Sequence, residues 1–376
     1  MRALVTGGGG FLGQYLVERL VADGCETRTF CRRPHAELDR FGVEQCLGDL
    51  RRFEDVDRAC ANCDVVYHIA AFPSIVMDPR PYYETNVLGT KNVLAACLKN
   101  RVRKLVYTST QCVANTIESQ EGVDESVPFA PRFLGWYQMT KAIAEQIVRA
   151  ANYAPWTDSY DFEGVDLSES KFRSLNSTFH FRTPRRDPTR EDALMTVALR
   201  PHLIWGPKDR HLVPRLLERK RMGKLMRVGD GRNLLSTIYV QNAADAHKMA
   251  ADALEPNGTV PGSVYYIAQD KPLNCWKWID EILAMVGEPP VERSISFKTA
   301  WLAGSALERL YRLFGKKGEP IMTRFLATQL AQSYWFNTDR AKRELGFTPA
   351  VSTEEGMRRM GEDLHERGIG AQVSFL

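Results

Sequence analysis

The first thirteen residues of this chain constrain its fold more than any other stretch. Residues 2–6 form an apolar run of strand length, and the segment 11–23 carries leucines at helical spacing. Three spaced glycines lie between these two segments. Gly7 allows a tight turn, Gly10 lets the backbone approach a pyrophosphate, and Gly13 permits close packing of a helix on a strand. This order of strand, glycine turn and helix predicts a dinucleotide site at the N-terminus of the helix.

The residues directly after the turn belong to the same predicted site. Phe11 and Leu12 begin the helix, so the free N–H groups of this first turn would face the phosphates. A run of four glycines also occurs in ordinary loops. The strand before the run and the helix after it favour dinucleotide binding.

The tip of the second predicted strand, residues 26–31, indicates which dinucleotide is bound. An acidic residue at this tip would bind the ribose hydroxyl of NAD, whereas an arginine accommodates the extra phosphate of NADP. Glu26 is acidic, but it begins the strand and so lies at the end away from the ligand. Arg32 and Arg33 stand at the correct end, where they are either phosphate ligands or a solvated basic turn. We therefore predict NADP(H) rather than NAD(H).

Strands and helices alternate along the first part of the chain with short links between them. This pattern predicts an α/β protein with a Rossmann doubly wound parallel sheet. Ligands of such sheets bind at the carboxyl ends of the strands, where Ala70 and Ala71 are small enough for a cofactor to lie against them. The further elements predicted are strands over 43–47, 65–69 and 104–108 and a helix over 79–100.

A tyrosine and a lysine at the start of another predicted helix suggest the chemistry. Tyr137 and Lys141 are four residues apart and so share a helix face. A phenol near pKa 10 is a poor acid or base at neutral pH. One cation some 4 Å away contributes on the order of 4 kcal/mol at an effective dielectric of about 20, or about three pKa units. We expect Lys141, helped by an oxidised nicotinamide, to bring Tyr137 into the range of a general acid or base.

A third hydroxyl is expected to polarise the substrate oxygen. Thr108, Ser109 and Thr110 compete for this role, and the alternation of side chains along a strand lets few of them face the site.

These motifs together resemble the extended short-chain dehydrogenases/reductases. Residues 199–207, Leu-Arg-Pro-His-Leu-Ile-Trp-Gly-Pro, and residues 239–243, Tyr-Val-Gln-Asn-Ala, are similar to the 3β-hydroxysteroid dehydrogenase/isomerase branch. Nucleotide-sugar epimerases and dehydratases usually carry Arg-Asp-aromatic and Val-x-Asp in the region of residues 232–242. Here that stretch reads Arg-Asn-Leu-Leu-Ser-Thr-Ile-Tyr-Val-Gln-Asn, which disfavours a sugar diphosphate as the substrate.

The resemblance implies roles for further residues. It places Thr110 at the catalytic Ser/Thr position, with Ser109 as the alternative, and Asn86 as a brace of the site. The cofactor contacts that it implies are Asp49 and Leu50 beside the adenine and Pro201, His202 and Leu203 beside the nicotinamide.

Residues 295–299, 318–325 and 334–335 resemble the 2-alkyl-3-oxoalkanoate reductases of long-chain olefin biosynthesis. The resemblance implies an NADP(H)-dependent oxidoreductase that interconverts a 3-oxo and a 3-hydroxy group on a bulky lipid-like substrate, with Arg324 as a candidate anchor for its carboxylate. The alternative is a 3β-hydroxysteroid or sterol-4α-carboxylate 3-dehydrogenase, with or without isomerase activity. A catalytically silent dinucleotide-binding redox sensor or scaffold is a hypothesis of another class, disfavoured by the intact catalytic set.

Composition limits the partners and the compartment. The formal net charge of +4 is too mild and too dispersed for a nucleic-acid partner. No apolar run reaches the roughly 18 residues of a membrane span. Cys60 and Cys63 have no second pair at metal-ligand spacing, so no metal site is predicted. The scattered cysteines suggest a reducing compartment, the cytoplasm.

Two domains are predicted. Residues 1–205 and 230–268 would form the NADP-binding Rossmann domain, with an atypical aromatic-rich insertion of about 152–193 that has no assigned role. Residues 206–229 and 269–376 would form a smaller substrate-binding domain.

One amphipathic segment has two interpretations. Residues 297–317 combine apolar positions at helical spacing with basic residues, as in a helix that caps the substrate domain or a helix in peripheral contact with a membrane. The sequence is also compatible with a homodimer.

Overall fold

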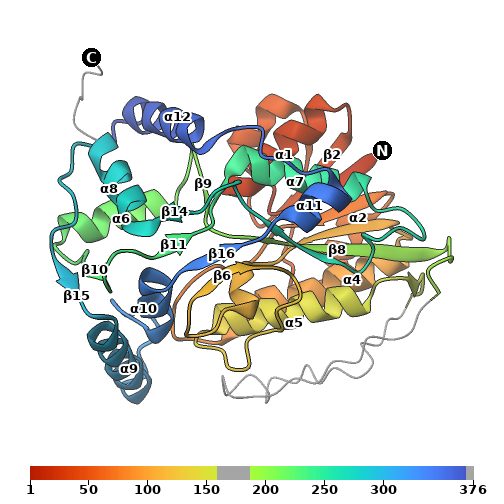
Figure 1. The fold of residues 1–376 in the computed structure, drawn as a ribbon. Helices are drawn as coiled ribbons and strands as arrows, with labels where there is room; N and C mark the ends of the chain where they lie inside the picture. The colour runs from red at the N-terminus through yellow and green to blue at the C-terminus, as the bar shows by residue number, and fades with distance from the viewer. Residues whose placement is uncertain (159–186, 370–376) are drawn as a thin grey trace.

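A parallel sheet forms the frame on which the candidate site is built (Figure 1). The computed structural model describes residues 1–158 and 187–369. The strands follow the order β13-β8-β5-β4-β1-β2-β3 across the sheet, and all of these neighbours pair in parallel. Their bounds are β1 Arg2–Thr6, β2 Glu26–Cys31, β3 Glu44–Leu47, β4 Val65–His68, β5 Lys104–Thr108, β8 Ala193–Pro201 and β13 Val264–Ile267.

The strand order reverses at β1, which has β2 on one side and β4 on the other. The register pairs Thr6 with Phe30 of β2 and with His68 of β4. The residues that follow these three strands therefore meet at one edge of the sheet. In doubly wound sheets this switch point is where ligands bind.

Side chains of the central strands alternate between two hydrophobic cores. On β1, Ala3 and Val5 pack in the core that includes α1, α7 and α11, whereas Leu4 packs in the core that includes α2, α4 and α5. Figure 1 shows α1, α7 and α11 over one face of the sheet and α4 and α5 over the other. The predicted doubly wound sheet is thus present. These helices span α1 Phe11–Ala22, α2 Phe53–Cys60, α4 Gly89–Lys99, α5 Trp136–Ala150, α7 Val240–Asp252 and α11 Asp339–Leu345.

The helix predicted over 79–100 contains a π-helical stretch. A short helix, α3 (Arg80–Tyr82), runs into the π-helical η2 (Tyr83–Leu88) and then into α4. Single π-helical turns inside α-helices are frequent at functional sites. Asn86 lies in this stretch and is buried.

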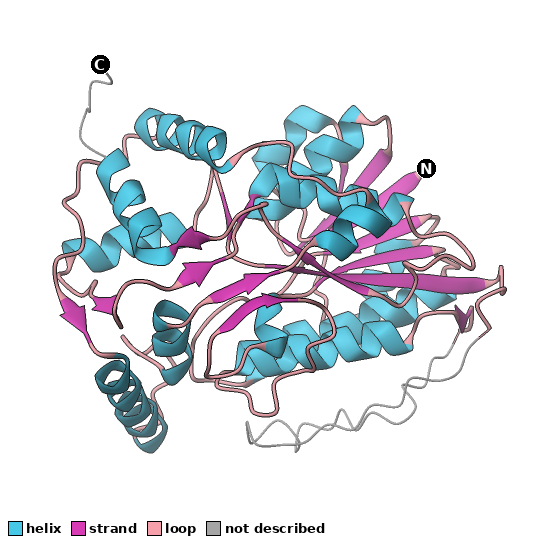
Figure 2. Cartoon of the chain, viewed as in Figure 1, coloured by secondary structure: helices cyan, strands magenta, loops and turns pink. Residues whose placement is uncertain are grey.

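A second, smaller sheet carries the other part of the molecule. Its order is β14-β11-β16-β6, and the core beside it is centred on large side chains such as Trp205, Trp276 and Trp278. Figure 2 shows its short strands beyond the end of the central sheet. The elements of this part are β6 Gln120–Val123, β11 Leu234–Leu235, β14 Leu273–Asn274, β16 Tyr334–Phe336, α6 Leu212–Arg221, α8 Cys275–Met285, α9 Phe297–Leu313, α10 Arg324–Ala331 and α12 Thr353–Glu366.

Some elements pack with the part of the molecule other than the one to which their predicted domain range corresponds. β6 and β11 come from ranges predicted for the Rossmann domain, but they pair in the second sheet. Conversely, α11 comes from the predicted substrate domain and packs in the core with α1 and α7. The difference arises because strand pairing depends on distant residues, which a local pattern does not reveal.

The insertion of about 152–193 is described only at its ends. β7 (Ala154–Pro155) pairs antiparallel with the start of β8, and residues 159–186, which hold most of the aromatic side chains noted in the sequence, lie outside the described residues. Among the described helices, none is long and apolar enough to cross a membrane. The remaining short elements are η1 Ala36–Phe41, η3 Gln111–Ala114, β9 Ile204–Trp205, β10 Arg227–Val228, β12 Ile238–Tyr239 and β15 Ser294–Ile295.

Candidate active site

The glycine turn links β1 to α1 in a tightly packed arrangement. Gly7 has a φ of +72°, which side-chain-bearing residues rarely adopt. Its N–H donates to Phe30 O at 2.8 Å, and the Gly10 N–H donates back to Gly7 O at 2.8 Å. A Cβ on Gly13 would lie only 2.2 Å from Gly7 O, so the first turn of α1 rests directly on the loop.

This turn fits the phosphates of a dinucleotide. Gly10 is the N-cap of α1 and offers no side-chain cap, so the N–H groups of the first helical turn are left for another acceptor. The Phe11 side chain packs edge-on against Tyr15, and the Leu12 side chain is buried in the core. These two residues therefore present backbone rather than side-chain groups to a phosphate.

The loop after β2 places cations beside the turn. Arg32 and Arg33 are exposed, and neither has a carboxylate within 4.0 Å in the part of the chain that the structure describes. His35 follows, and its ring lies so close to the turn that a Cβ on Gly9 would be 2.1 Å from it. Burial lowers the pKa of His35. The sequence did not single out His35, because its position depends on the path of the loop.

The other predicted adenine-side residues also lie along this edge. Asp49 is half-buried, and its carboxylate accepts from the Arg51 side chain at 2.6 Å. Leu50 is buried, and Ala70 lies against Gly7, where a Cβ on the glycine would be 3.1 Å from Ala70 Cα. The half-buried Ala71 follows.

The tyrosine and the lysine stand at the start of α5, as predicted. Tyr137 is half-buried, whereas Lys141 is 2% exposed. The Lys141 ammonium donates to Thr108 O at 2.6 Å and lies 4.2 Å from the centroid of the Tyr107 ring. Its contacts thus tie α5 to the end of β5.

The pKa of Tyr137 moves in the direction opposite to the one expected from Lys141. Burial raises the pKa of the phenol well above its ordinary value, and the hydroxyl of Thr110 partly opposes this shift. Burial also lowers the pKa of Lys141 to about 7, although Glu145 raises it. Burial disfavours both the Tyr137 phenolate and the Lys141 ammonium. This effect outweighs the attraction between the two ions that the sequence suggested.

The three competing hydroxyls face different partners. Thr108 Oγ1 lies 2.7 Å from His247 Nε2, and Ser109 Oγ donates to Glu145 Oε2 at 2.6 Å. Thr110 is the N-cap of η3 and lies beside the Tyr137 phenol, whose pKa it lowers. Of the three, Thr110 is thus the one placed next to the phenol.

Asn86 joins the loop after β4 to α5. Its Oδ1 accepts from Phe72 N at 2.7 Å, and its Nδ2 donates to Thr140 Oγ1 at 3.1 Å. The π-helical turn brings the side chain between these two partners. This position is suited to the bracing role that the resemblance implied.

The segment after β8 contains the three residues predicted to lie beside the nicotinamide. Pro201 ends the strand, and His202 is buried with its Nδ1 unpartnered among the described residues. Burial lowers the pKa of His202 to about 3, so the ring is neutral. Leu203 has a φ of +42°, a strained value for a residue with a side chain and typical of functional segments.

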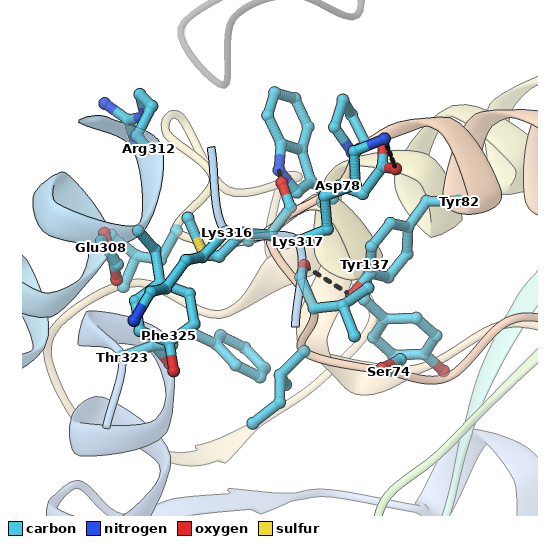
Figure 3. Close-up of a pocket in the computed structure, with 18 of the residues that line it drawn as sticks. Ser74, Asp78, Tyr82, Tyr137, Glu308, Arg312, Lys316, Lys317, Thr323 and Phe325 are labelled. Carbon is cyan, nitrogen blue, oxygen red and sulfur yellow. Dashed lines mark hydrogen bonds and ion pairs between the residues drawn. The ribbon is translucent and has the colours of Figure 1, made fainter. Parts of the chain in front are cut away.

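A cavity of about 340 Å³ opens beside Tyr137 (Figure 3). Its wall is largely apolar, and Figure 3 shows Tyr82, Tyr137 and Ser74 on one side with Glu308, Thr323 and Phe325 on the other. The apolar lining residues are Ile75, Val76, Met77, Pro79, Leu134, Trp136 and Phe325.

Two segments that line this cavity are joined to each other. The Met77 N–H donates to Lys317 O at 3.2 Å, and Ser74 Oγ donates to Glu319 Oε1 at 2.9 Å. The Lys317 ammonium lies 3.5 Å from Asp78 Oδ2. The segment after β4 is thus fastened to the segment after α9.

Arg324, the candidate carboxylate anchor, is already paired. Its guanidinium donates to Glu308 Oε2 at 2.8 Å, and its backbone N–H donates to Glu308 Oε1 at 2.7 Å. Glu308 is buried, so the ion pair neutralises a charge within the wall. This correction leaves Arg312 and Lys316 as the lining cations without a carboxylate partner in the described ranges.

Comparison with known proteins identifies the class. The model of the 3-beta hydroxysteroid dehydrogenase/isomerase family matches residues 4–167 and 186–298. The chain belongs to this family and is an oxidoreductase, which confirms the resemblance noted in the sequence.

Individual relatives share most of the chain. It is 41% identical over 363 residues to a 2-alkyl-3-oxoalkanoate reductase of Shewanella oneidensis, covering 96% of this chain and 86% of that protein. It is 42% identical to a protein of the same name from Stenotrophomonas maltophilia, covering 96% and 98%. A human sterol-4-alpha-carboxylate 3-dehydrogenase, decarboxylating, is 30% identical, covering 95% and 87%. The solved structure of gox2253 has a TM-score of 0.71 at 21% identity, covering 98% and 99%, and supports the Rossmann fold.

Proposed function

We propose that this protein is an NADP(H)-dependent reductase of 2-alkyl-3-oxoalkanoates, which converts the 3-oxo group to a 3-hydroxy group. The observation that carries the proposal is the largely apolar cavity that Tyr137 lines. Relatives 41% and 42% identical over nearly the whole chain bear this activity in their names. A cavity of this kind suits alkyl chains better than a sugar diphosphate.

The chain's own residues bind and orient the reactants. The glycine turn and the N-terminus of α1 would hold the pyrophosphate, with Ala70 and Ala71 against the cofactor. When bound, the nicotinamide supplies a hydride to the carbonyl carbon. Tyr137 donates its phenolic proton to the carbonyl oxygen, and Thr110 donates a hydrogen bond to the same oxygen. Burial raises the pKa of Tyr137 and so opposes this transfer, whereas the hydrogen bond of Thr110 lowers that pKa and favours it.

Lys141 and Asn86 position the acid rather than replace it. Lys141 donates to Thr108 O at the end of β5, and its ammonium would bind a cofactor ribose there. Asn86 fixes the loop after β4 to Thr140 on the helix that bears Tyr137. We infer that the loss of either residue disturbs alignment more than proton transfer itself.

The preference for NADP(H) over NAD(H) is a second testable part of the proposed function. Arg32 and Arg33 are exposed and without a carboxylate within 4.0 Å in the described residues, so they are available to a 2′-phosphate. We expect Arg32→Gln/Arg33→Gln to weaken NADPH binding at least about tenfold, because charge-assisted hydrogen bonds contribute about 1.5–3 kcal/mol each. NADH binding should change little.

Fluorescence titration of both dinucleotides measures this preference. Arg358→Gln/Arg359→Gln, on the remote helix α12, is the matched control and should leave both affinities unchanged. A wild-type protein that already prefers NADH would contradict the assignment.

The proposed substrate is tested by comparing the turnover rates of two substrates, a 2-alkyl-3-oxo acid and a sterol 4α-carboxylate, each with both cofactors. We expect a 3-oxo acid with a long 2-alkyl branch to be reduced with NADPH much faster than a sterol 4α-carboxylate is oxidised with NAD. The human relative makes the sterol dehydrogenase the alternative. Activity confined to 3β-hydroxysterols with NAD would establish that alternative instead.

The same assay separates an enzyme from a silent sensor or scaffold. Consumption of NADPH that depends on the added 3-oxo acid indicates turnover, whereas dinucleotide binding without consumption indicates a sensor. Free cysteines and the proposed NADP(H) chemistry suit a cytoplasmic setting, which we include in the proposal.

A further inference from the structure

Helix α9 presents an unpartnered apolar face to the outside. Its inner face, with Ala300 and Gly304, packs on α10 so closely that a Cβ on Gly304 would lie 2.6 Å from the Thr323 backbone. The opposite face has no such cover. Its large apolar side chains remain exposed: Leu302 by 54%, Leu310 by 47%, Leu313 by 78% and Phe314 by 67%.

These side chains form one continuous stripe. At about 100° per residue, positions 302, 306, 310, 313 and 314 fall within roughly a third of the helix circumference. α9 lies at an outer corner of the molecule, away from the central sheet (Figure 1). Scattered single apolar residues are normal on a surface, whereas a contiguous stripe on one helix indicates a contact surface.

Uncompensated cations flank this stripe. Lys298, Arg309, Arg312 and Lys316 are exposed, and none has a carboxylate within 4.0 Å in the part of the chain that the structure describes. Many other exposed arginines of the protein are paired, as Arg358 is with Glu355. The flank therefore carries positive charge that no neighbouring group offsets.

We propose that α9 and the turn after it are a docking surface for an anionic lipid membrane. An apolar stripe beside a basic flank is the arrangement of a helix that lies in the membrane interface. Clustered basic side chains are attracted to negatively charged lipid headgroups. A contact between two copies of this face would instead bring two sets of unpaired cations together, which makes a second copy the weaker occupant.

The location of the stripe relative to the cavity supports a lipid partner. Arg312 and Lys316 belong to the basic flank and also line the cavity that contains Tyr137. Docking through this face would hold the cavity rim close to the lipid surface. If the proposed function holds, a substrate with long alkyl chains would reach the site from the membrane itself. The docking proposal does not depend on that function.

Vesicle flotation of the full chain tests the proposal. We expect the protein to float with vesicles of phosphatidylcholine and phosphatidylglycerol and to bind phosphatidylcholine alone at least tenfold more weakly. Leu313→Asp/Phe314→Asp should reduce binding at least tenfold. Lys298→Gln/Arg309→Gln should remove the preference for the anionic vesicles, and added salt should do the same. None of these four residues lines the cavity.

Three controls make the result decisive. Met222→Asp removes another exposed apolar side chain, outside α9, and should bind as the wild type does. Thermal melts must show that the aspartate variants remain folded. Tyr137→Phe should bind vesicles normally, so loss of turnover and loss of docking are separable.

Two outcomes would overturn the proposal. One is a wild-type protein that binds neither vesicle. A concentration-dependent dimer in analytical ultracentrifugation that Leu313→Asp/Phe314→Asp abolishes would, in that case, identify the stripe as a contact between copies. The other is vesicle binding that Leu313→Asp/Phe314→Asp leaves unchanged, since the stripe would then not be the surface that docks.

Discussion

Replacing Tyr137 by phenylalanine is expected to lower turnover by about 10²- to 10⁴-fold, the usual contribution of a general acid. Tyr137 lines the cavity and its phenol is hydrogen-bonded to Thr110, so it is the group placed to protonate a carbonyl oxygen. NADPH affinity should stay nearly unchanged, because the pyrophosphate would bind the glycine turn after β1 rather than the phenol on α5.

The measurement is steady-state turnover of a 3-oxo acid together with an NADPH titration. Tyr67→Phe is the matched control, since it removes a hydroxyl that is buried on β4 and unpartnered among the described residues. Turnover by Tyr137→Phe at the wild-type rate would refute the assigned role.

Replacing Glu145 by alanine is expected to destabilise the fold by about 3–5 kcal/mol, because it leaves a buried guanidinium without its counter-charge. Glu145 is 0% exposed and Arg200 is 2% exposed, and two hydrogen bonds of 2.7 and 2.9 Å join them. Ser109 donates a third bond to the same carboxylate. Urea unfolding measures the loss.

Two further variants test the cause. Glu355→Ala removes a carboxylate whose side chain is 36% exposed and that also pairs with arginines, and it should change stability little. Glu145→Leu/Arg200→Met removes both buried charges and should recover part of the stability. If Glu145→Ala is as stable as Glu355→Ala, the buried pair does not stabilise the fold as argued.

Some parts of this site could be predicted because their signal is local. The glycine turn depends on Gly7 and Gly13, whose backbone requirements show directly in the sequence. Tyr137 and Lys141 share a helix face through spacing alone. Five strands of the central sheet, β1 to β5, also follow from the local pattern, whereas β13 was not predicted.

Other parts depend on groups that meet only in the fold. The pKa of Tyr137 reflects burial, which spacing to Lys141 does not report. Arg324 is not a free anchor, because Glu308, on another helix, pairs with its guanidinium. The choice between Ser109 and Thr110 likewise required the position of Glu145.

The strand order of the second sheet affects how the chain folds during synthesis. β16 lies between β11 and β6, and Tyr334 pairs with Gln120 across more than half of the sequence. Such non-local pairing slows folding. Until the last part of the chain leaves the ribosome, β6 and β11 lack this partner and expose strand edges that favour aggregation. A protein that ends before residue 334 would lack β16 and would leave the edges of β6 and β11 unpaired. We therefore expect such a shortened protein to aggregate rather than fold.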